Sequence, residues 1–324
     1  MNRFQYASAA SAKEAVSLLD KDFGKTKILA GGLDLVGELK QYIIEPETVV
    51  NISDIKELNY IEPENGGLKI GALTTLMQIA QSEPIRSHHA ALAQAASMVG
   101  SPQIRHIGTL GGNLCQRPRC WYYRDETYPC LKKSGEICFS VAGRNRYHAI
   151  LGGSPCFIVH PSDCATALIA LGASIRLLGP DGPRELPLEE FFTLPEVEVT
   201  RENVLHPQEI ITEAVIPAHK MKSVFLKFKE KDSFDWAVAT VAAALELEGG
   251  RRCVKANIIL GAAAPIPWRA KKAEALLAGQ TISEELAEKA GAAAVADAEP
   301  LEENQYKVSL LKALVKQSIL QIAG

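Results

Sequence analysis

Apolar and polar positions along the chain follow two different spacings, which predict both helices and strands. Apolar residues at helical spacing predict a first helix over residues 11–20. The same spacing predicts further helices at 76–82, 90–98, 163–171, 269–277, 284–296 and 306–322. Short apolar runs predict strands at 27–30, 48–52, 68–70, 156–160, 174–178, 209–216 and 223–228.

Two longer segments near the C-terminus alternate weakly between apolar and polar residues. Residues 237–247 and 254–260 flank the pair Gly249-Gly250, which predicts an antiparallel hairpin. The segment from Pro217 to Lys220 is the predicted domain boundary.

Residues 101–153 interrupt the regular pattern. The segment has little periodicity, a glycine pair at 111–112 and five aromatic residues between Trp121 and Phe139. A loop this long within a compact domain is usually functional or disordered. Its aromatic and cysteine content argues against disorder, so we expect a functional loop.

Composition indicates an ordinary globular protein. The chain has 324 residues, 47% apolar and 23% charged, which excludes a disordered or fibrous chain. A net charge of −3 gives no basic field for nucleic acid or anionic lipid. No apolar run approaches the roughly 20 residues of a membrane span. The first residues, with Lys13, Glu14 and Asp20, indicate an amphipathic helix rather than a secretory signal, so we expect a cytoplasmic protein.

The cysteines are unevenly distributed. Of the seven, six fall between Cys115 and Cys164, and Cys253 stands alone. An odd count in a large chain disfavours a disulfide framework and favours metal or redox chemistry. The spacing C-x4-C-x9-C-x7-C-x17-C-x7-C lacks the paired C-x2-C elements of zinc ribbons and common ferredoxins. Spacing alone therefore leaves the metal open.

Two glycine pairs follow apolar segments, at Gly31-Gly32 and Gly111-Gly112. Glycine lets successive backbone N–H groups approach an anion, so two such turns can hold a pyrophosphate from both sides. Neither pair matches a dinucleotide-binding G-x-G-x-x-G or a P-loop. The alternative is two ordinary tight turns.

Two polar motifs have simple structural explanations. In His160-Pro161-Ser162-Asp163, Ser162 or Asp163 can cap a helix that starts there. Lys227, Lys229 and Lys231 alternate along a predicted strand and by default form a solvated face.

Ordered motifs along the chain match those of one known family: residues 28–35, 70–75, 109–113, 160–163, 234–237 and Leu260-Gly261-Ala262-Ala263-Ala264-Pro265. The chain resembles the FAD-binding medium subunit of molybdenum hydroxylases, the xanthine dehydrogenase and carbon monoxide dehydrogenase family. The resemblance covers nearly the whole chain.

This resemblance implies an α+β fold. A two-subdomain FAD-binding domain of the PCMH/VAO type would occupy residues 1–55 and 56–217. A C-terminal α+β domain with an antiparallel sheet and helices would occupy residues 218–324.

The resemblance also implies the FAD contacts. The two glycine motifs would hold the pyrophosphate through backbone N–H groups, Asp163 would bind the ribityl region, and Ile211 and Lys227 would lie near the isoalloxazine ring. Leu33 stands where the family usually has Thr, so we expect weakened FAD binding. The pyrophosphate residues are Ile28, Leu29, Ala30, Gly31, Gly32, Leu33, Asp34, Leu35, Thr109, Leu110, Gly111, Gly112 and Asn113.

The cysteine-rich loop, about residues 114–156, resembles an insertion in the beta subunit of 4-hydroxybenzoyl-CoA reductase. That insertion holds an extra [4Fe–4S] cluster. The resemblance implies Cys120, Cys130, Cys138 and Cys156 as its ligands, with Cys115 and Cys164 as bystanders. A zinc-stapled loop or free thiols remain alternatives.

The family implies an electron-transfer role. The chain would relay electrons between the [2Fe–2S] clusters of a small partner subunit and an external carrier such as ferredoxin or NAD(P). Substrate chemistry would take place on a large subunit with a molybdenum cofactor, in a dimer of heterotrimers. The alternatives are a self-sufficient flavin reductase of the same fold group and a zinc-stapled, non-redox scaffold subunit.

Overall fold

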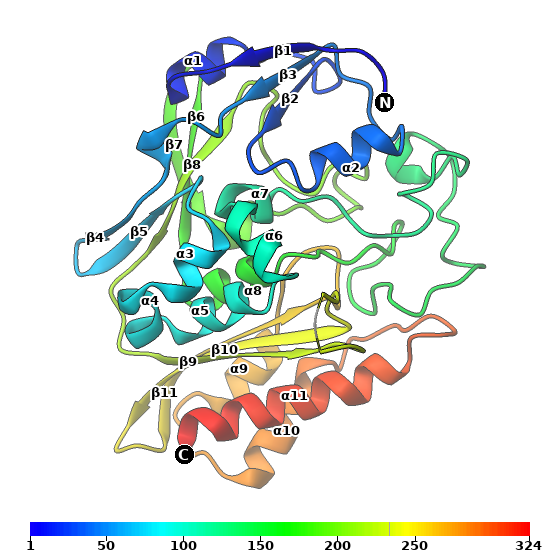
Figure 1. Cartoon of the computed structure of the whole chain (residues 1–324). Helices are drawn as coiled ribbons and strands as arrows, with labels where there is room; N and C mark the ends of the chain where they lie inside the picture. Colours follow the sequence, from blue (N-terminus) through cyan, green and yellow to red (C-terminus); the bar gives the residue numbers. More distant parts are fainter. Residues whose placement is uncertain (233) are drawn as a thin grey trace.

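The computed structural model describes residues 1–232 and 234–324 and contains three sheets, each with its own helices. The sheets follow one another from the N-terminal to the C-terminal end of the molecule, and the cysteine-rich segment lies at one side of the middle layer (Figure 1). Among the described residues, no helix is both long and apolar enough to cross a membrane.

The N-terminal layer is a three-stranded parallel sheet in the order β1-β3-β2. The helical expectation for the very first residues is wrong, because Gln5–Ser8 pairs with Thr48–Asn51 as a strand. The helix starts only at Ala12, after Ser11 caps it by accepting from the backbone N–H of Glu14. The elements are β1 Gln5–Ser8, α1 Ala12–Ser17, β2 Thr26–Leu29, α2 Leu35–Lys40 and β3 Thr48–Asn51.

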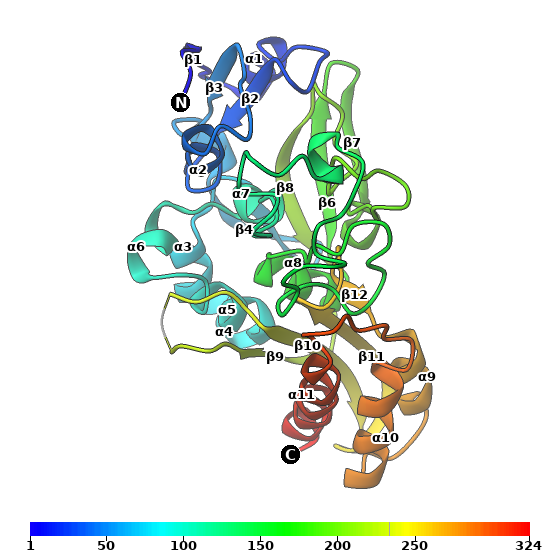
Figure 2. The same cartoon turned by 90° about the vertical axis from the view of Figure 1, so that its right-hand side faces the viewer.

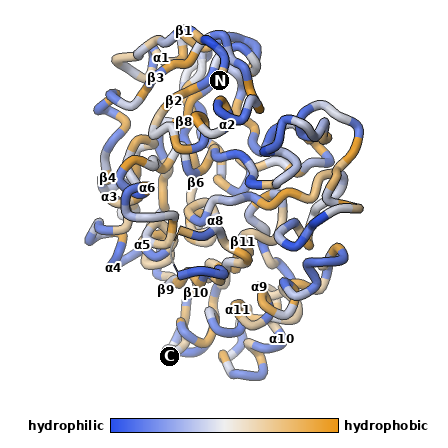
Figure 3. Tube along the Cα trace, turned by 45° about the vertical axis from the view of Figure 1, so that its right-hand side comes forward, coloured by the Kyte–Doolittle hydropathy of each residue, from blue (hydrophilic) through white to orange (hydrophobic). Residues whose placement is uncertain are grey.

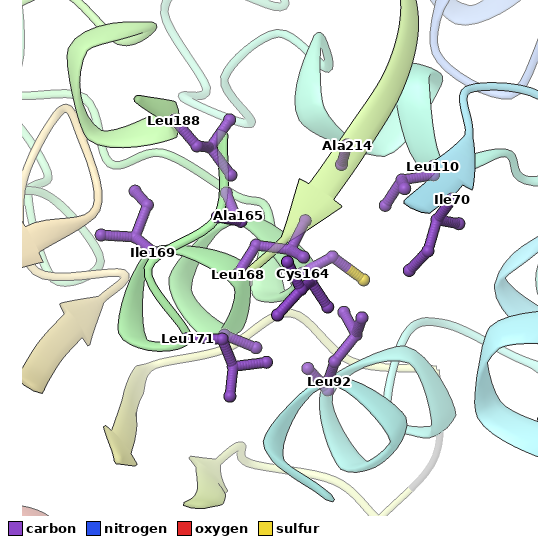
Figure 4. Close-up of a cluster of buried hydrophobic side chains, with 14 of the residues drawn as sticks. Ile70, Leu92, Leu110, Cys164, Ala165, Leu168, Ile169, Leu171, Leu188 and Ala214 are labelled. Carbon is purple, nitrogen blue, oxygen red and sulfur yellow. The ribbon is translucent and has the colours of Figure 1, made fainter. Parts of the chain in front are cut away.

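The middle layer is a five-stranded sheet, β4-β5-β8-β6-β7, with six helices between its strands in the sequence. Every residue of α8 is buried, and its Leu168 and Ile169 lie within the apolar cluster of Figure 4. The strands are β4 Ile61–Glu64, β5 Gly67–Gly71, β6 Ser174–Gly179, β7 Gly182–Pro187 and β8 Ile210–Ile216. The helices are α3 Leu76–Gln81, α4 Glu83–His88, α5 Ala90–Ser97, α6 Pro102–Ile107, α7 Leu110–Leu114 and α8 Asp163–Ala170.

The C-terminal layer is an antiparallel sheet in the order β12-β11-β10-β9. The predicted hairpin at Gly249-Gly250 is confirmed, and both glycines have positive φ. The elements are β9 Lys222–Phe228, β10 Ala239–Glu248, β11 Arg252–Gly261, β12 Trp268–Arg269, α9 Lys271–Leu277, α10 Glu284–Ala294 and α11 Tyr306–Ala323.

Strand β10 is buried on both faces, which explains its weak alternation. Val241 and Ala243 pack with α9, α10 and α11, whereas Ala242 and Ala244 pack into the core of the middle layer. Figure 2 shows the C-terminal sheet with α9, α10 and α11 on one side and the helices of the middle layer on the other. In the hydropathy view, polar residues lie mainly on the outer faces and loops (Figure 3). The middle and C-terminal layers therefore share an apolar interface.

The predicted strand at 156–160 is wrong. These residues pair with no strand and instead hydrogen-bond to two neighbouring loops: Phe157 O accepts from Ala149 N at 2.8 Å, and His160 N donates to Ala264 O at 3.0 Å. An apolar run alone does not supply a partner strand. Besides β1, the sequence pattern missed the short strands β4, β7 and β12 and the four short helices α2, α4, α6 and α7.

Helix α11 fixes the cysteine-rich segment to the C-terminal layer through a buried lysine. Lys307 is fully buried, and its Nζ donates to the carbonyl oxygens of Tyr147 at 2.8 Å, His148 at 3.1 Å and Ala262 at 2.8 Å. Burial lowers the pKa of Lys307 to about 7.

This lysine makes stability depend on pH. Between about pH 7 and the ordinary lysine pKa, the unfolded chain binds a proton here that the folded chain does not, so stability rises with pH. Relative to a Lys307→Met variant, the wild-type chain should gain up to about 2 kcal/mol of unfolding free energy between about pH 7 and pH 9. Urea denaturation of both proteins measures this difference, and parallel pH dependences would contradict it.

Candidate functional site

Two glycine turns from different layers meet at the wall of the largest described cavity. This cavity has a volume of about 1160 Å³, and both turns line it. A Cβ on Gly31 would lie 2.3 Å from the carbonyl oxygen of Ile107, just before the second turn. Only glycine permits this approach of the two backbones.

The first turn presents free backbone donors. Gly32 has a φ of 72°, which brings the chain from β2 into α2. Within the described part of the chain, the N–H groups of residues 31–35 donate to no protein acceptor. A run of unpaired N–H groups at a cavity wall can bind an anion.

The second turn lacks the free backbone N–H groups that its glycine pair predicts. Thr109 caps the short helix α7 by accepting from Gly112 N. The N–H groups of Leu110 and Gly111 donate to Thr74 O and Ala72 O, and that of Asn113 donates to Thr109 O. Since these four N–H groups are already bonded, this turn contributes backbone proximity rather than free donors.

Ion pairs join the first turn to the cysteine-rich segment. The Asp34 carboxylate accepts from Arg117 N at 2.6 Å and from Arg124 Nη2 at 2.6 Å, and it also pairs with Arg119. Burial alone would raise the pKa of Asp34, but Arg119 and Arg124 outweigh it and hold that pKa below its ordinary value. Asp34 therefore stays ionised and fixes the start of the segment.

A second carboxylate anchors the same segment. Glu202, which is buried, pairs with Arg117 Nε at 2.6 Å and with Lys132 Nζ at 2.6 Å. Lys132 Nζ also donates to Val199 O at 2.8 Å. The basic residues around the cysteines are thus largely neutralised by protein carboxylates.

The four cysteines expected as ligands line one small cavity, although the first and the last lie 36 positions apart in the sequence. Cys130 and Cys156 are buried, and Cys120 and Cys138 are partly exposed. Cys138 Sγ lies 3.1 Å from Ser140 Oγ. A hydrogen bond with the Cys156 thiol lowers the pKa of Cys138 to about 5, despite burial.

The remaining cysteines lie elsewhere. Cys164 is in the core of the middle layer, Cys115 lines the large cavity and Cys253 is buried in β11. Across residues 1–232 and 234–324, no three His, Cys, Asp or Glu side chains meet closely enough to form a site for a single metal ion.

Lys227 is not on a solvated face. Its Nζ lies 2.6 Å from Asp163 Oδ2, and both side chains are almost completely buried. Ser162 caps α8 by accepting from Ala165 N, so the capping interpretation holds for Ser162 while Asp163 pairs with the lysine. Burial raises the pKa of Asp163, and Lys227 opposes that rise.

The structure does not bring all the expected flavin residues to one cavity wall. Leu29 and Leu110 do not line the large cavity, and Leu110 packs in the apolar core. Asp163 lines a second cavity of about 330 Å³, and Lys227 lines neither. The residues that do line the large cavity are Ile28, Ala30, Gly31, Gly32, Leu33, Asp34, Leu35, Thr109, Gly111, Gly112, Asn113 and Ile211.

Sequence reasoning missed several polar residues of the site. The alternating arginines of Arg117-Pro118-Arg119 were a visible signal, but their acceptors were not. Glu202 and His148 carry no motif, because each meets its partner only through the fold.

Comparisons with known proteins agree with this architecture. Residues 2–219 match the family described as "FAD binding domain in molybdopterin dehydrogenase", and residues 223–322 match "CO dehydrogenase flavoprotein C-terminal domain". The chain is 32% identical over 319 residues to the aldehyde oxidoreductase FAD-binding subunit PaoB of Escherichia coli (strain K12), covering 96% of each chain.

Carbon monoxide dehydrogenase of Hydrogenophaga pseudoflava is similar in both sequence and structure. Its medium chain is 28% identical over 324 residues, covering 98% of this chain and 96% of that one. A solved structure of that enzyme lacking the Mo-pyranopterin moiety superposes with a TM-score of 0.78 at 29% identity, over 99% of this chain and 97% of that one. The chain therefore belongs to the FAD-binding subunits of the molybdenum hydroxylase family.

Proposed function

We propose that this subunit carries both FAD and a [4Fe–4S] cluster and relays electrons between partner [2Fe–2S] clusters and an external carrier. The observation that supports it best is the meeting of Cys120, Cys130, Cys138 and Cys156 around one cavity. The segment that carries these cysteines is joined by Asp34 to the first glycine turn.

FAD fits the large cavity through the first turn. Its pyrophosphate would accept from the free N–H groups of residues 31–35, and the second turn would close the other side. These backbone donors do not depend on the side chain at Leu33, so the missing threonine hydroxyl weakens binding without abolishing it.

Asp163, Lys227 and Ile211 are proposed to contact the rest of the cofactor. Asp163 would bind the ribityl region, and Ile211 and Lys227 would lie near the isoalloxazine ring. The ion pair between Asp163 and Lys227 supports this, because it holds both side chains in fixed positions. A bound flavin exchanges electrons singly or in pairs, so it couples one-electron centres to a two-electron partner.

The four thiols fit a [4Fe–4S] cluster in number and chemistry, because such clusters are held by four cysteine thiolates. The thiols of Cys138 and Cys156 share one hydrogen bond, which lowers the pKa of Cys138 and raises that of Cys156. Arg117, Arg119, Arg124 and Lys132 are bound to Asp34 or Glu202, so these ion pairs fix the segment that would hold the cluster.

The proposed partners are a large subunit with a molybdenum cofactor and a small subunit with [2Fe–2S] clusters, in a dimer of heterotrimers. The relatives support this, since they are named as medium chains or FAD-binding subunits of dehydrogenases and oxidoreductases. Ferredoxin or NAD(P) is the proposed external carrier. Within this chain we propose FAD-binding subdomains at 1–55 and 56–217 and a C-terminal domain at 218–324.

Gly31→Ala tests the FAD site. The added Cβ would meet the Ile107 carbonyl at 2.3 Å and force the two turns apart. We expect at least a roughly tenfold loss in FAD affinity, equivalent to about 1.4 kcal/mol. FAD released from the purified protein measures retention, and titration of deflavinated protein with FAD measures affinity.

Gly37→Ala in α2 is the matched control for this substitution. Its Cβ would lie 4.0 Å from Arg124 Nη1, the nearest atom outside the helix, and alanine favours a helix. Normal FAD content is expected. Equal FAD affinity in Gly31→Ala and Gly37→Ala would contradict the proposed pyrophosphate site at the first glycine turn.

Iron content tests the cluster. After anaerobic purification, Cys130→Ser and Cys138→Ser should lose about four irons and the matching sulfide per copy of this chain. Cys115→Ala and Cys253→Ala should retain them, because neither lines the cysteine cavity. Unchanged turnover of Cys130→Ser with the physiological electron partner would remove the cluster from the electron path.

The same purified protein separates the alternatives. Flavin with about four irons on this chain supports the relay. Flavin without these irons would indicate an FAD-binding subunit of this family that carries no cluster, and zinc without flavin favours a scaffold subunit.

A further inference from the structure

We propose that His148 is a positioning residue that tunes the reduction potential of the cluster by donating a hydrogen bond to Cys120. This inference rests on the proposed [4Fe–4S] function. It concerns a residue outside the expected ligand set, in the same irregular segment.

The contact between the two side chains is direct. His148 is buried, and its Nε2 lies 3.2 Å from Cys120 Sγ. A ligating thiolate carries no hydrogen, so Nε2 must be the donor in this contact. Among the residues that the structure describes, Nδ1 of this ring has no hydrogen-bond partner.

The position of His148 is fixed from outside the cysteine-rich segment. Its carbonyl oxygen accepts from Asn304 Nδ2 at 3.1 Å and from Lys307 Nζ at 3.1 Å, and both donors lie at the start of or just before α11. The imidazole also packs against the rings of Trp121 and Tyr122, with centroids 6.4 and 6.2 Å away. The N–H···S contact is thus preorganised rather than a chance orientation on a loose loop.

His148 also lies between two cavities. Both Cys120 and His148 line the cysteine cavity and the 330 Å³ cavity, and Asp163 lines the latter. The bond therefore lies on the side of the cysteine cavity that faces an expected flavin contact. A donor at this place acts on Cys120 Sγ, and Cys120 is the proposed ligand that lines both cavities.

Hydrogen bonds to the sulfurs of an iron–sulfur cluster are one of the factors that set its potential. Reduction adds negative charge, which an N–H donor stabilises, so losing the donor makes reduction harder. We expect about a tenfold change in the reduction equilibrium, which is about 59 mV for a one-electron couple.

The test compares His148→Leu, which removes the donor, with His148→Gln, which keeps an N–H group on a polar side chain. The holoenzyme is purified anaerobically, iron and sulfide are measured, and the cluster potential is obtained from a redox titration monitored by EPR. We expect full iron in both variants, a more negative potential in His148→Leu, and partial or full recovery in His148→Gln. His88→Leu, at the end of α4, is the control and should leave the potential unchanged.

The outcomes separate this inference from the proposed function. Full iron with an unchanged potential in His148→Leu overturns the inference and leaves the cluster proposal intact. Wild-type protein without these irons overturns the proposed function itself.

A variant that loses iron is still informative. His148→Phe keeps a ring of similar size but has no donor. Loss of iron in both Leu and Phe variants with retention in Gln supports the hydrogen bond, because only the donor distinguishes them. Loss in all three variants overturns it.

Discussion

The carboxylate of Asp34 holds together parts of the chain that have little regular structure of their own. It lies at the first glycine turn and binds a backbone N–H and two guanidinium groups from the cysteine-rich segment, more than 80 residues away in the sequence. Since Arg119 and Arg124 keep it ionised despite burial, its bonds are charge-assisted and strong. Glu202 and Lys307 complete the attachment at two other points. An irregular segment with one short 3₁₀ turn thereby acquires a defined shape from its surroundings.

Much of the fold could be predicted because its elements repeat apolar residues at regular spacing. The hairpin of β10 and β11 and the helices α8 to α11 lie close to their predicted ranges. Predictions failed where tertiary context overrides a local pattern. Residues 156–160 are apolar but have no strand beside them, and Lys227 alternates like a surface residue but pairs with Asp163 inside the protein.

The candidate site could likewise be predicted from the sequence only in part. Glycine pairs and clustered cysteines are unusual enough to be recognised from the sequence alone. The four cysteines that were expected together do line one cavity. The nature of the second turn was not visible, because whether an N–H group is free depends on the acceptors that the fold supplies, here Thr74 and Ala72. The acceptor Glu202 and the donor His148 were invisible for the same reason.

Strand β10, which is buried on both faces, joins the two matched segments of the chain through one apolar interface. Its two faces pack against helices from both matched sequence families, with Ala242 and Ala244 on one side and Val241 and Ala243 on the other. Severing the chain near residue 220 would expose an apolar face on each fragment. The two matched segments are distinct in sequence but share one closely packed apolar interface, so a change of side-chain volume on one side of β10 must be accommodated by the helices on the other.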